Sequence, residues 1–258
     1  MGVLEHPFRV VTRVTWLGSE LVLLAVLYVF RVVLRTNQSL TEARAHWLQQ
    51  GCRRVLRVFN AEVRSSGRVP QAGLLVSNHL GYLDILTLGA LTPSVFVAKR
   101  DVKHWPIFGW FARLAGTLFA DRERSSQVAE LTKDMQSVLN SGSVVILFPE
   151  GTSSDGQTVL PFKSSLLEPA TVCSYPLTTS LIAYRLDDGD VTEEVCYWKD
   201  MTLVPHLINL LSKKRIEVSV QFAHIRRAST NRKELARQLH SEVLKLKHLQ
   251  HMFAMAGN

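Results

Sequence analysis

The chain has 258 residues, a hydrophobic fraction of 47%, a formal net charge of +8 and a pI near 9.6. This length fits one large domain or a domain plus an appendage, with enough apolar residues for a substantial core. The charge favours anionic partners, but no Lys/Arg-rich tail or nucleic-acid-binding module is visible, so we expect no nucleic acid among them. The chain has three cysteines, far apart in sequence: Cys52, Cys173 and Cys196. This odd number and wide spacing argue against a disulfide framework and fit a reducing compartment.

The most hydrophobic window, residues 14–34, contains only two charged side chains, Glu20 and Arg31. Its uninterrupted apolar run covers residues 21–30, half of the roughly 20 residues that a spanning helix needs. Ten apolar residues contribute about −4 kcal/mol to insertion, and one central charge costs about 2.5 to 3.5 kcal/mol. Insertion is therefore marginal unless Glu20 reaches the interface or finds a partner. We expect membrane association, with a spanning, an interfacial and a buried core helix all left open.

The next segment predicts an amphipathic helix with a basic face. Arg53, Arg54 and Arg57 lie on that face, and the opposite, apolar face carries Trp47, Leu48, Cys52, Val55, Leu56 and Phe59. Such a helix suits the headgroup boundary of anionic lipid, and it equally suits ordinary packing on a core with the arginines in solvent. We assign residues 1–60 to N-terminal membrane-associated helices and residues 61–258 to the globular domain.

From residue 67 onward, short apolar runs alternate with helical patterns. The patterns predict strands at residues 73–77, 94–98, 117–120, 143–148 and 177–184, with further strand candidates at 194–198 and 215–222. They predict helices at residues 83–91, 107–115, 127–140, 162–171 and 231–249, the last with an Asn cap. The run at 143–148 is continuously apolar, which is typical of a central strand. The fold class is therefore α/β, a mixed, largely parallel sheet flanked by helices, with an N-terminal membrane-associated helical segment.

A first polar cluster, Asn78-His79-Leu-Gly-Tyr-Leu-Asp84, follows the first predicted strand, where α/β sheets usually bind ligands. On one regular helix, His79 and Asp84 would point about 140° apart. We therefore expect His79 in the loop and Asp84 in the first helical turn, reaching back to the imidazole. A carboxylate on one ring nitrogen makes the other a better general base for a hydroxyl. The spacing alone also fits a simple loop hydrogen bond.

Two further clusters follow later strands. The first reads Gly116-Thr-Leu-Phe-Ala-Asp-Arg122-Glu-Arg124, in which a guanidinium can hold a phosphate in a bidentate manner or pair with a neighbouring carboxylate. The second reads Phe148-Pro-Glu-Gly-Thr-Ser-Ser154, in which Gly151 permits close backbone approach and the hydroxyls can bond oxygens of a substrate. A tight turn with local side-chain bonds is the structural alternative for this segment.

In this order, the three clusters resemble the motifs of the lysophospholipid acyltransferase family, typified by 1-acylglycerol-3-phosphate acyltransferases. That family carries Asn-His-x4-Asp, Gly-x-x-Phe-x-x-Arg and Phe-Pro-Glu-Gly blocks, which match residues 78–84, 116–122 and 148–151 here. The resemblance covers roughly residues 55 to 225, and a family-like Val-Ala-Lys99 follows the second predicted strand. Residues 61–258 are then the acyltransferase domain.

The resemblance implies that His79 deprotonates the acceptor hydroxyl, that Asp84 orients His79, and that the hydroxyl attacks the thioester of acyl-CoA or acyl carrier protein. It implies no metal, no bound cofactor and no covalent acyl-enzyme intermediate. Arg122, with Lys99, would hold the acceptor's phosphate, and Glu150 and Gly151 would shape the acceptor pocket. The full set of expected substrate-binding residues is Asn78, Lys99, Arg122, Glu150, Gly151 and Thr152.

The implied partners are a lysophospholipid acceptor, the acyl donor and membrane lipid, at the cytoplasmic face of the inner (plasma) membrane. The acceptor first expected is 1-acylglycerol-3-phosphate, which would give phosphatidic acid. Two departures leave it open: Ser165 stands where the family often has Gly, and the fourth block retains only Pro176 of two usual prolines. A lyso-aminolipid acceptor such as lyso-ornithine lipid is the alternative.

Two other classes of function compete with this interpretation. A lipid hydrolase or thioesterase would use a Ser-His-Asp set, but the chain has no Gly-x-Ser-x-Gly elbow. A non-catalytic lipid-binding protein would not depend on His79. The aromatic stretch at residues 105–111 could line an acyl-chain tunnel, contact lipid or pack as an ordinary core helix.

Overall fold

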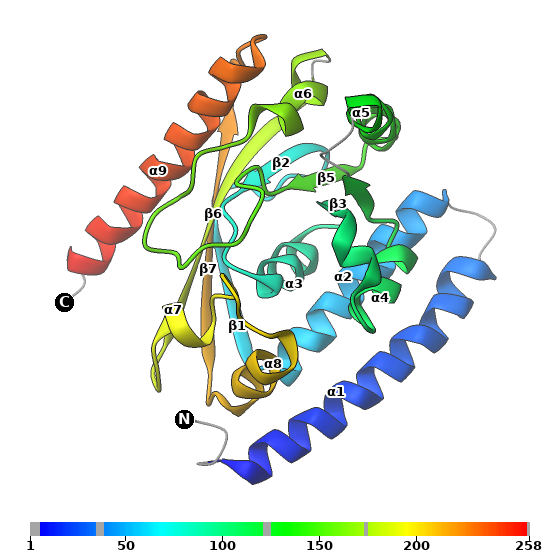
Figure 1. Ribbon diagram of the computed structural model, residues 1–258, viewed down its shortest axis with the longest axis vertical. Helices are drawn as coiled ribbons and strands as arrows, with labels where there is room; N and C mark the ends of the chain where they lie inside the picture. Colours follow the sequence, from blue (N-terminus) through cyan, green and yellow to red (C-terminus); the bar gives the residue numbers. More distant parts are fainter. Residues whose placement is uncertain (1–5, 35–38, 121–124, 173–174, 257–258) are drawn as a thin grey trace.

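A seven-stranded sheet lies at the centre of the protein, whose computed structural model describes residues 6–34, 39–120, 125–172 and 175–256 (Figure 1). The strand order is β1-β7-β6-β2-β5-β3-β4. Strands β2 to β6 are parallel, whereas β7 is antiparallel to β6 and parallel to β1. The bounds are β1 Ala61–Ser66, β2 Gly73–Ser77, β3 Ser94–Lys99, β4 Leu118–Ala120, β5 Val144–Leu147, β6 Leu177–Leu186 and β7 Ile216–Ile225. The predicted mixed, largely parallel sheet is confirmed.

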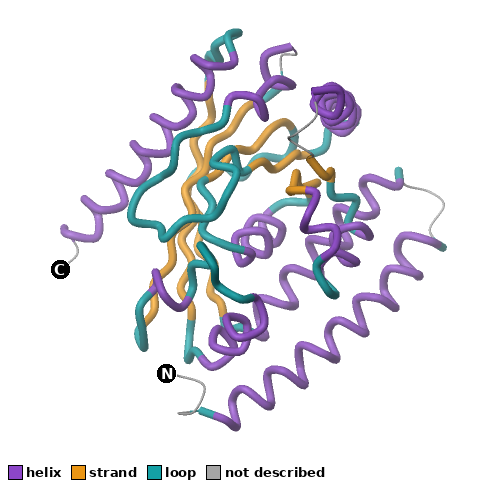
Figure 2. Tube along the Cα trace, viewed as in Figure 1, coloured by secondary structure: helices purple, strands orange, loops and turns teal. Residues whose placement is uncertain are grey.

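Helices cover both faces of this sheet (Figure 2). One core contains residues of α1 (Pro7–Tyr28), α2 (Leu40–Val58), α3 (Tyr82–Leu91) and α8 (Leu203–Ser212), with α4 (Phe108–Leu114) packed against it. The opposite core contains residues of α5 (Ser125–Asn140), η3 (Ser164–Leu167) and α9 (Arg232–Ala256), with α6 (Glu168–Val172) alongside. Two further short helical elements are η2 (Arg100–His104) and α7 (Val191–Glu194). The four residues of β5 are all buried between β2 and β3, which confirms the predicted central strand.

Several elements differ from the sequence prediction. Residues 194–198 do not form a strand: Asp190 caps the short α7, and the Tyr197 N–H donates to the Leu80 carbonyl oxygen in the loop that follows β2. The single helix predicted at 162–171 is a 3-10 turn followed by a new helix near Pro169, because proline suits only a first helical turn. The sequence prediction omitted the polar edge strand β1 and the helix α8.

The amphipathic α2 packs on the core rather than presenting its apolar face to lipid. Trp47, Cys52 and Phe59 are buried against the sheet side of the domain. The basic face is partly engaged by protein, because Arg53 Nε donates to the Ala90 carbonyl oxygen at 2.8 Å. Of the two alternatives for this helix, a position at the lipid headgroups and packing on the core, the structure shows packing on the core.

Helix α1 continues into a π-helical turn, η1 (Val29–Val33), and its one acidic residue has a protein partner. Glu20 is 7% exposed, and its carboxylate accepts hydrogen bonds from Arg54 Nε at 2.5 Å and from Trp16 Nε1 at 3.0 Å. Burial raises the pKa of Glu20, but the Arg54 and Trp16 bonds outweigh it, so the pKa is lowered overall. The charge that made insertion marginal is therefore neutralised between α1 and α2.

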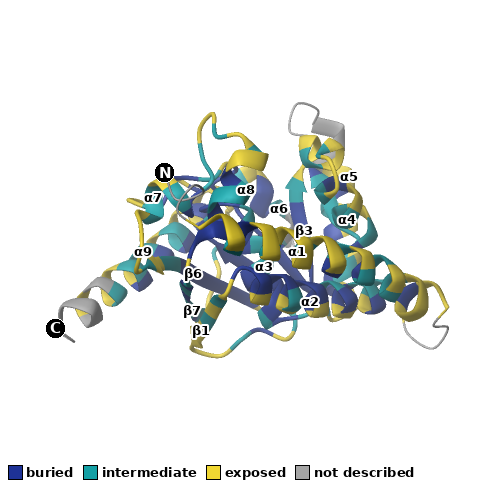
Figure 3. Ribbon diagram, turned by 90° about the horizontal axis from the view of Figure 1, so that it is seen from below, coloured by how far each residue is buried: buried dark blue, intermediate teal, exposed yellow. Residues whose placement is uncertain are grey.

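The N-terminal part of α1 is attached to α8. Arg9 donates to the Ser212 carbonyl oxygen at 2.7 Å. Arg13 donates to the Leu211 carbonyl oxygen at 3.1 Å and to the Lys213 carbonyl oxygen. Because the last carbonyls of a helix lack intrahelical partners, these guanidiniums also satisfy the end of α8. The outer face of α1 and η1 is exposed (Figure 3). Its exposed apolar side chains include Phe8, Val11, Val22, Val26, Val29, Phe30 and Val33. Residues 7–33 are long and apolar enough to cross a membrane.

We expect Arg54→Ala to lower the free energy of unfolding by about 1 to 3 kcal/mol, because it leaves the Glu20 carboxylate buried without its cation. Arg54 is one-third exposed, so solvent screening favours the lower part of this range. Since the pKa of Glu20 is lowered in the fold, the contribution is present at neutral pH and is lost below about pH 4.5. Urea unfolding in detergent at pH 7 measures it. Gln50→Ala, an exposed and uncharged change on the same helix, should stay within about 0.5 kcal/mol.

Candidate active site

The site begins where β2 ends. Because β2, β3 and β5 run parallel, their carboxyl ends meet at one edge of the sheet, and this edge carries His79, Lys99 and Glu150. His79 lies in the loop after β2, and Asp84 lies in the first turn of α3, as the spacing predicted. His79 Nδ1 and Asp84 Oδ2 are 2.8 Å apart. The imidazole also stacks on Phe148 with 4.2 Å between ring centres and an interplanar angle of 18°, which fixes the plane of the ring.

Asp84 is fully buried and receives four hydrogen bonds. Its Oδ2 accepts from His79 and from the backbone N–H groups of Leu80 at 2.6 Å and Gly81 at 2.9 Å. Its Oδ1 accepts from the Tyr184 hydroxyl at 2.5 Å. An ionised carboxylate can only accept, so Nδ1 of His79 carries the proton and Nε2 is left as the acceptor. Buried charge is stable only when hydrogen-bonded in this way.

Glu150 braces the loop that carries His79. It is 2% exposed, its Oε1 accepts from the His79 N–H at 3.0 Å, and its Oε2 accepts from the Leu160 N–H at 3.2 Å. Burial raises the pKa of Glu150 to about 8, although the two N–H bonds act in the opposite direction. The side chain therefore links the His79 loop to the segment at residues 151–163, which returns from the end of β5.

We expect the titration of Glu150 to contribute to the pH dependence of the free energy of unfolding. Between pH 4.5 and about 8 the folded protein holds a proton on Glu150 that the unfolded chain releases, so the free energy of unfolding falls as pH rises through this interval. Glu150→Gln should remove that part of the slope. Unfolding at several pH values measures it, and an unchanged slope in the variant would contradict the assignment. Glu130→Gln, an exposed change on α5, is the matched control.

The other expected site residues lie in different surroundings. The Asn78 side chain is buried, and its amide exchanges two hydrogen bonds with the backbone of Ile182, so it extends the β2–β6 pairing behind the dyad. Lys99 at the end of β3 and Thr152 are exposed and line the same pocket as His79. Gly151 has a φ of +75°, a conformation that favours glycine, and lines that pocket too. Arg122 lies outside the described residues.

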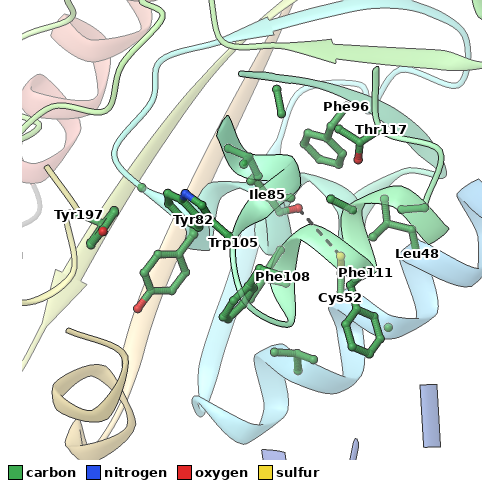
Figure 4. Close-up of a pocket in the computed structure, with 18 of the residues that line it drawn as sticks. Leu48, Cys52, Tyr82, Ile85, Phe96, Trp105, Phe108, Phe111, Thr117 and Tyr197 are labelled. Carbon is green, nitrogen blue, oxygen red and sulfur yellow. Dashed lines mark hydrogen bonds between the residues drawn. The ribbon is translucent and has the colours of Figure 1, made fainter. Parts of the chain in front are cut away.

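An apolar pocket of about 340 Å³ opens beside His79. Figure 4 shows its aromatic wall, where the side chains of Tyr82, Phe96, Trp105, Phe108 and Phe111 surround the cavity. The pocket is also lined by α1 and α2, through Leu17, Leu21, Leu24, Trp47, Leu48, Gly51, Cys52 and Val55. The aromatic stretch at residues 105–111 therefore serves as pocket wall. Ile107 and Trp110 in the same stretch are also exposed.

This arrangement suits a general base at the mouth of a site for an apolar chain. The adjacent serines are engaged elsewhere: Ser153 donates to the Tyr197 carbonyl oxygen, and the Ser154 hydroxyl lies 3.4 Å from the His79 carbonyl oxygen. In the described part of the chain, no serine or cysteine side chain is hydrogen-bonded to the His79 ring, as a Ser-His-Asp hydrolase would require. Nor do these residues contain a cluster of three His, Cys, Asp or Glu side chains suited to a metal ion.

Sequence reasoning missed two participants in this geometry. Tyr184 lies 100 residues after Asp84 on β6, and no local pattern marks it. The sequence marks Phe148 only as part of a motif, whereas in the fold its ring stacks on the imidazole of His79. Tyr184 falls within a predicted strand and Phe148 at the end of one, but their contacts depend on the order of strands in the sheet.

The chain is similar to several known proteins. The family model described as "Acyltransferase" matches residues 60–183. The chain is 35% identical over 205 residues to the lyso-ornithine lipid O-acyltransferase of Brucella abortus, covering 73% of this chain and 77% of that protein. It is 31% identical over 153 residues to the 1-acyl-sn-glycerol-3-phosphate acyltransferase of Neisseria gonorrhoeae, covering 59% and 60%.

A solved structure shares the fold. The 1-acyl-sn-glycerophosphate (LPA) acyltransferase PlsC from Thermotoga maritima superposes with a TM-score of 0.69 at 17% identity, over 95% of this chain and 97% of that one. At this identity, the likeness describes the arrangement of helices and strands alone.

Proposed function

Because the chain belongs to the acyltransferase family, we propose that it transfers a fatty acyl group from an acyl thioester to the free hydroxyl of a lysolipid. The family resemblance carried by the three motif blocks is thereby confirmed, and the chain is an O-acyltransferase. The observation that carries the proposed mechanism is the His79–Asp84 hydrogen bond at the mouth of the apolar pocket.

In this mechanism, His79 is the general base and Asp84 orients it. Nε2 of His79 takes the proton of the acceptor hydroxyl as its oxygen attacks the thioester carbonyl carbon. The carbon–sulfur bond then breaks, and the imidazolium returns its proton to the leaving thiolate, so the enzyme ends as it began. Asp84 stabilises the imidazolium by its charge and fixes the tautomer through Nδ1. The reaction needs no covalent acyl-enzyme.

The apolar pocket supports a role in holding an acyl chain. Its wall is aromatic and aliphatic, and it continues from His79 toward α1 and α2. Burial of a chain there contributes about 0.8 kcal/mol per methylene, so several methylenes supply useful binding energy. We propose that the polar residues at the mouth, Lys99 and Thr152, meet the anionic part of a substrate, together with Arg122. Asn78 and Glu150 then act as supports of the loop rather than by touching substrate, since their polar atoms are engaged by backbone.

The acceptor that we propose first is lyso-ornithine lipid. Four relatives named for that acceptor match at 34–35% identity, two of them over 73% and 78% of this chain. Three relatives named for 1-acyl-sn-glycerol-3-phosphate match at 31–33% over 43–59% of it, which makes that lipid the second candidate. For the donor we propose acyl-CoA or acyl carrier protein, both of which present the required thioester.

We also propose that α1 lies against the membrane, at the cytoplasmic face of the inner membrane. Its inner face lines the pocket through Leu17 and Leu21, while its outer face is apolar and exposed. Contact with Arg54 on α2 and with the end of α8 ties it to the domain along its length. A helix held in this way suits the interface plane better than a free span.

A transfer assay with a panel of lysolipids tests the function. The panel contains lyso-ornithine lipid, 1-acylglycerol-3-phosphate and lysophosphatidylethanolamine, each offered with labelled acyl-CoA or acyl carrier protein and analysed by mass spectrometry. We expect a labelled diacyl product from lyso-ornithine lipid at the highest kcat/KM. Release of free fatty acid at the same rate with and without a lysolipid would instead identify a hydrolase. A preference for 1-acylglycerol-3-phosphate would overturn the acceptor and keep the reaction.

A further inference from the structure

The carboxylate that orients His79 has an unusual environment. Asp84 is fully buried, and no lysine or arginine among the described residues forms a salt bridge with it. Its charge is therefore held by hydrogen-bond donors alone, three on Oδ2 and one on Oδ1. Two of the Oδ2 donors are backbone N–H groups of its own loop. On Oδ1 the donor is the Tyr184 hydroxyl, brought from β6.

We propose that Tyr184 is a positioning residue of the acyl transfer, which acts on His79 through Asp84. The inference rests on the proposed function, since it assumes that His79 is the base. Donation from Tyr184 at 2.5 Å prevents rotation of the carboxylate and keeps Oδ2 directed at the imidazole. It also draws negative charge toward Oδ1, so it sets how strongly Asp84 stabilises protonated His79.

The surroundings of Tyr184 favour a permanent donor. Burial and the adjacent Asp84 charge raise the pKa of its hydroxyl well above the ordinary value, so it keeps its proton throughout the working pH range. The other titratable groups close to Asp84 are Glu150 and Cys196, and neither donates a hydrogen bond to it. Tyr184 does not line the apolar pocket, so its effect on substrate binding should be small.

Tyr184→Phe tests this role because it removes one oxygen and keeps the ring. We expect kcat to fall about 10- to 100-fold, with KM for both substrates within about threefold. Without the donor, more negative charge faces His79 and stabilises the imidazolium, so the acid limb of the kcat/KM profile should move to higher pH by about half a unit or more. Tyr175→Phe is the control: it removes a hydroxyl that lies away from the site and donates to Asn140 Oδ1 at 2.7 Å. It should leave kcat and the acid limb unchanged.

A double-mutant cycle separates a positioning role from a structural one. In the Asp84→Asn background, Tyr184→Phe should lower kcat by less than about threefold, because no carboxylate charge remains for Tyr184 to direct at His79. Equal costs in both backgrounds, or an unmoved acid limb, would overturn the inference. If Tyr184→Phe fails to fold, 3-fluorotyrosine at position 184 keeps the shape and donates more strongly, so the acid limb should move to lower pH; no movement would count against the proposal.

The proposed function has its own separate test. If His79→Ala removes activity while Tyr184→Phe leaves kcat and the pH profile unchanged, only the role of Tyr184 fails. Near-normal transfer by His79→Ala would overturn the proposed base and this inference together.

Discussion

His79→Ala is expected to lower kcat for acyl transfer by about 10³-fold or more while the protein stays folded and bound to membrane. The reason is that Nε2 of His79 is the proton acceptor of the proposed reaction, and general-base catalysis contributes about 10²–10⁴-fold. Removal also leaves Asp84 with its buried charge and one donor fewer. The measurement is steady-state transfer with labelled acyl thioester and the lysolipid that the panel identifies, beside vesicle co-sedimentation for membrane binding.

A matched control is available on the opposite face of the sheet. His248 is an exposed histidine on α9, and His248→Ala should keep kcat within about twofold. If His79→Ala kept near-normal transfer at unchanged KM, another group would have to be the base. Loss of membrane binding in the same variant would point to misfolding instead, which the thermal midpoint would reveal.

Asp84→Asn is expected to lower kcat by about 10²–10³-fold, with a smaller change in KM. An asparagine can place its oxygen where Oδ2 now accepts from His79, Leu80 and Gly81, and its NH₂ group can donate to the Tyr184 oxygen. The local geometry can therefore survive, and the loss measures the negative charge that stabilises the imidazolium. Kinetics over a pH range, together with the thermal midpoint, give this quantity.

Asp134→Asn supplies the control for this change. Asp134 is exposed on α5, so its substitution should leave kcat and the pH profile unaltered within about twofold. Full activity in Asp84→Asn would mean that the buried carboxylate serves only the loop. Reduced activity together with a much lower thermal midpoint would mean that Asp84→Asn cannot separate the catalytic effect of the charge from its effect on stability. Asp84→Glu, which keeps the charge, would then be measured.

Much of the fold was predictable because its central strands are strongly apolar. The run at residues 144–147 is entirely buried, and such a segment has few alternatives to a central parallel strand. The polar edge strand β1 was omitted because its residues are mostly exposed and it pairs only with β7, 155 positions further on. The strand predicted at 194–198 was wrong because an apolar run there packs on the site loop rather than on a ladder.

In the site, too, local positions were predictable and contacts between distant segments were not. Local spacing predicted that His79 lies in the loop and Asp84 on α3, since a regular helix could not bring them together. The roles of Lys99, Arg122 and Thr152 toward substrate remain predictions. Local sequence could not assign Asn78 and Glu150 to the support of the loop, because their partners, Ile182 and Leu160, come from other segments.

The sequence by itself determined the fold class, the family motifs and the expected reaction, because these depend on local patterns of apolar residues and on the spacing of chemical groups along the chain. Only the tertiary structure decided which groups complete the site. Glu20 meets Arg54, and Tyr184 meets Asp84, through contacts between elements far apart in sequence. Sheet order and helix packing set such contacts, and the buried charges they satisfy are stable only once the whole domain excludes water.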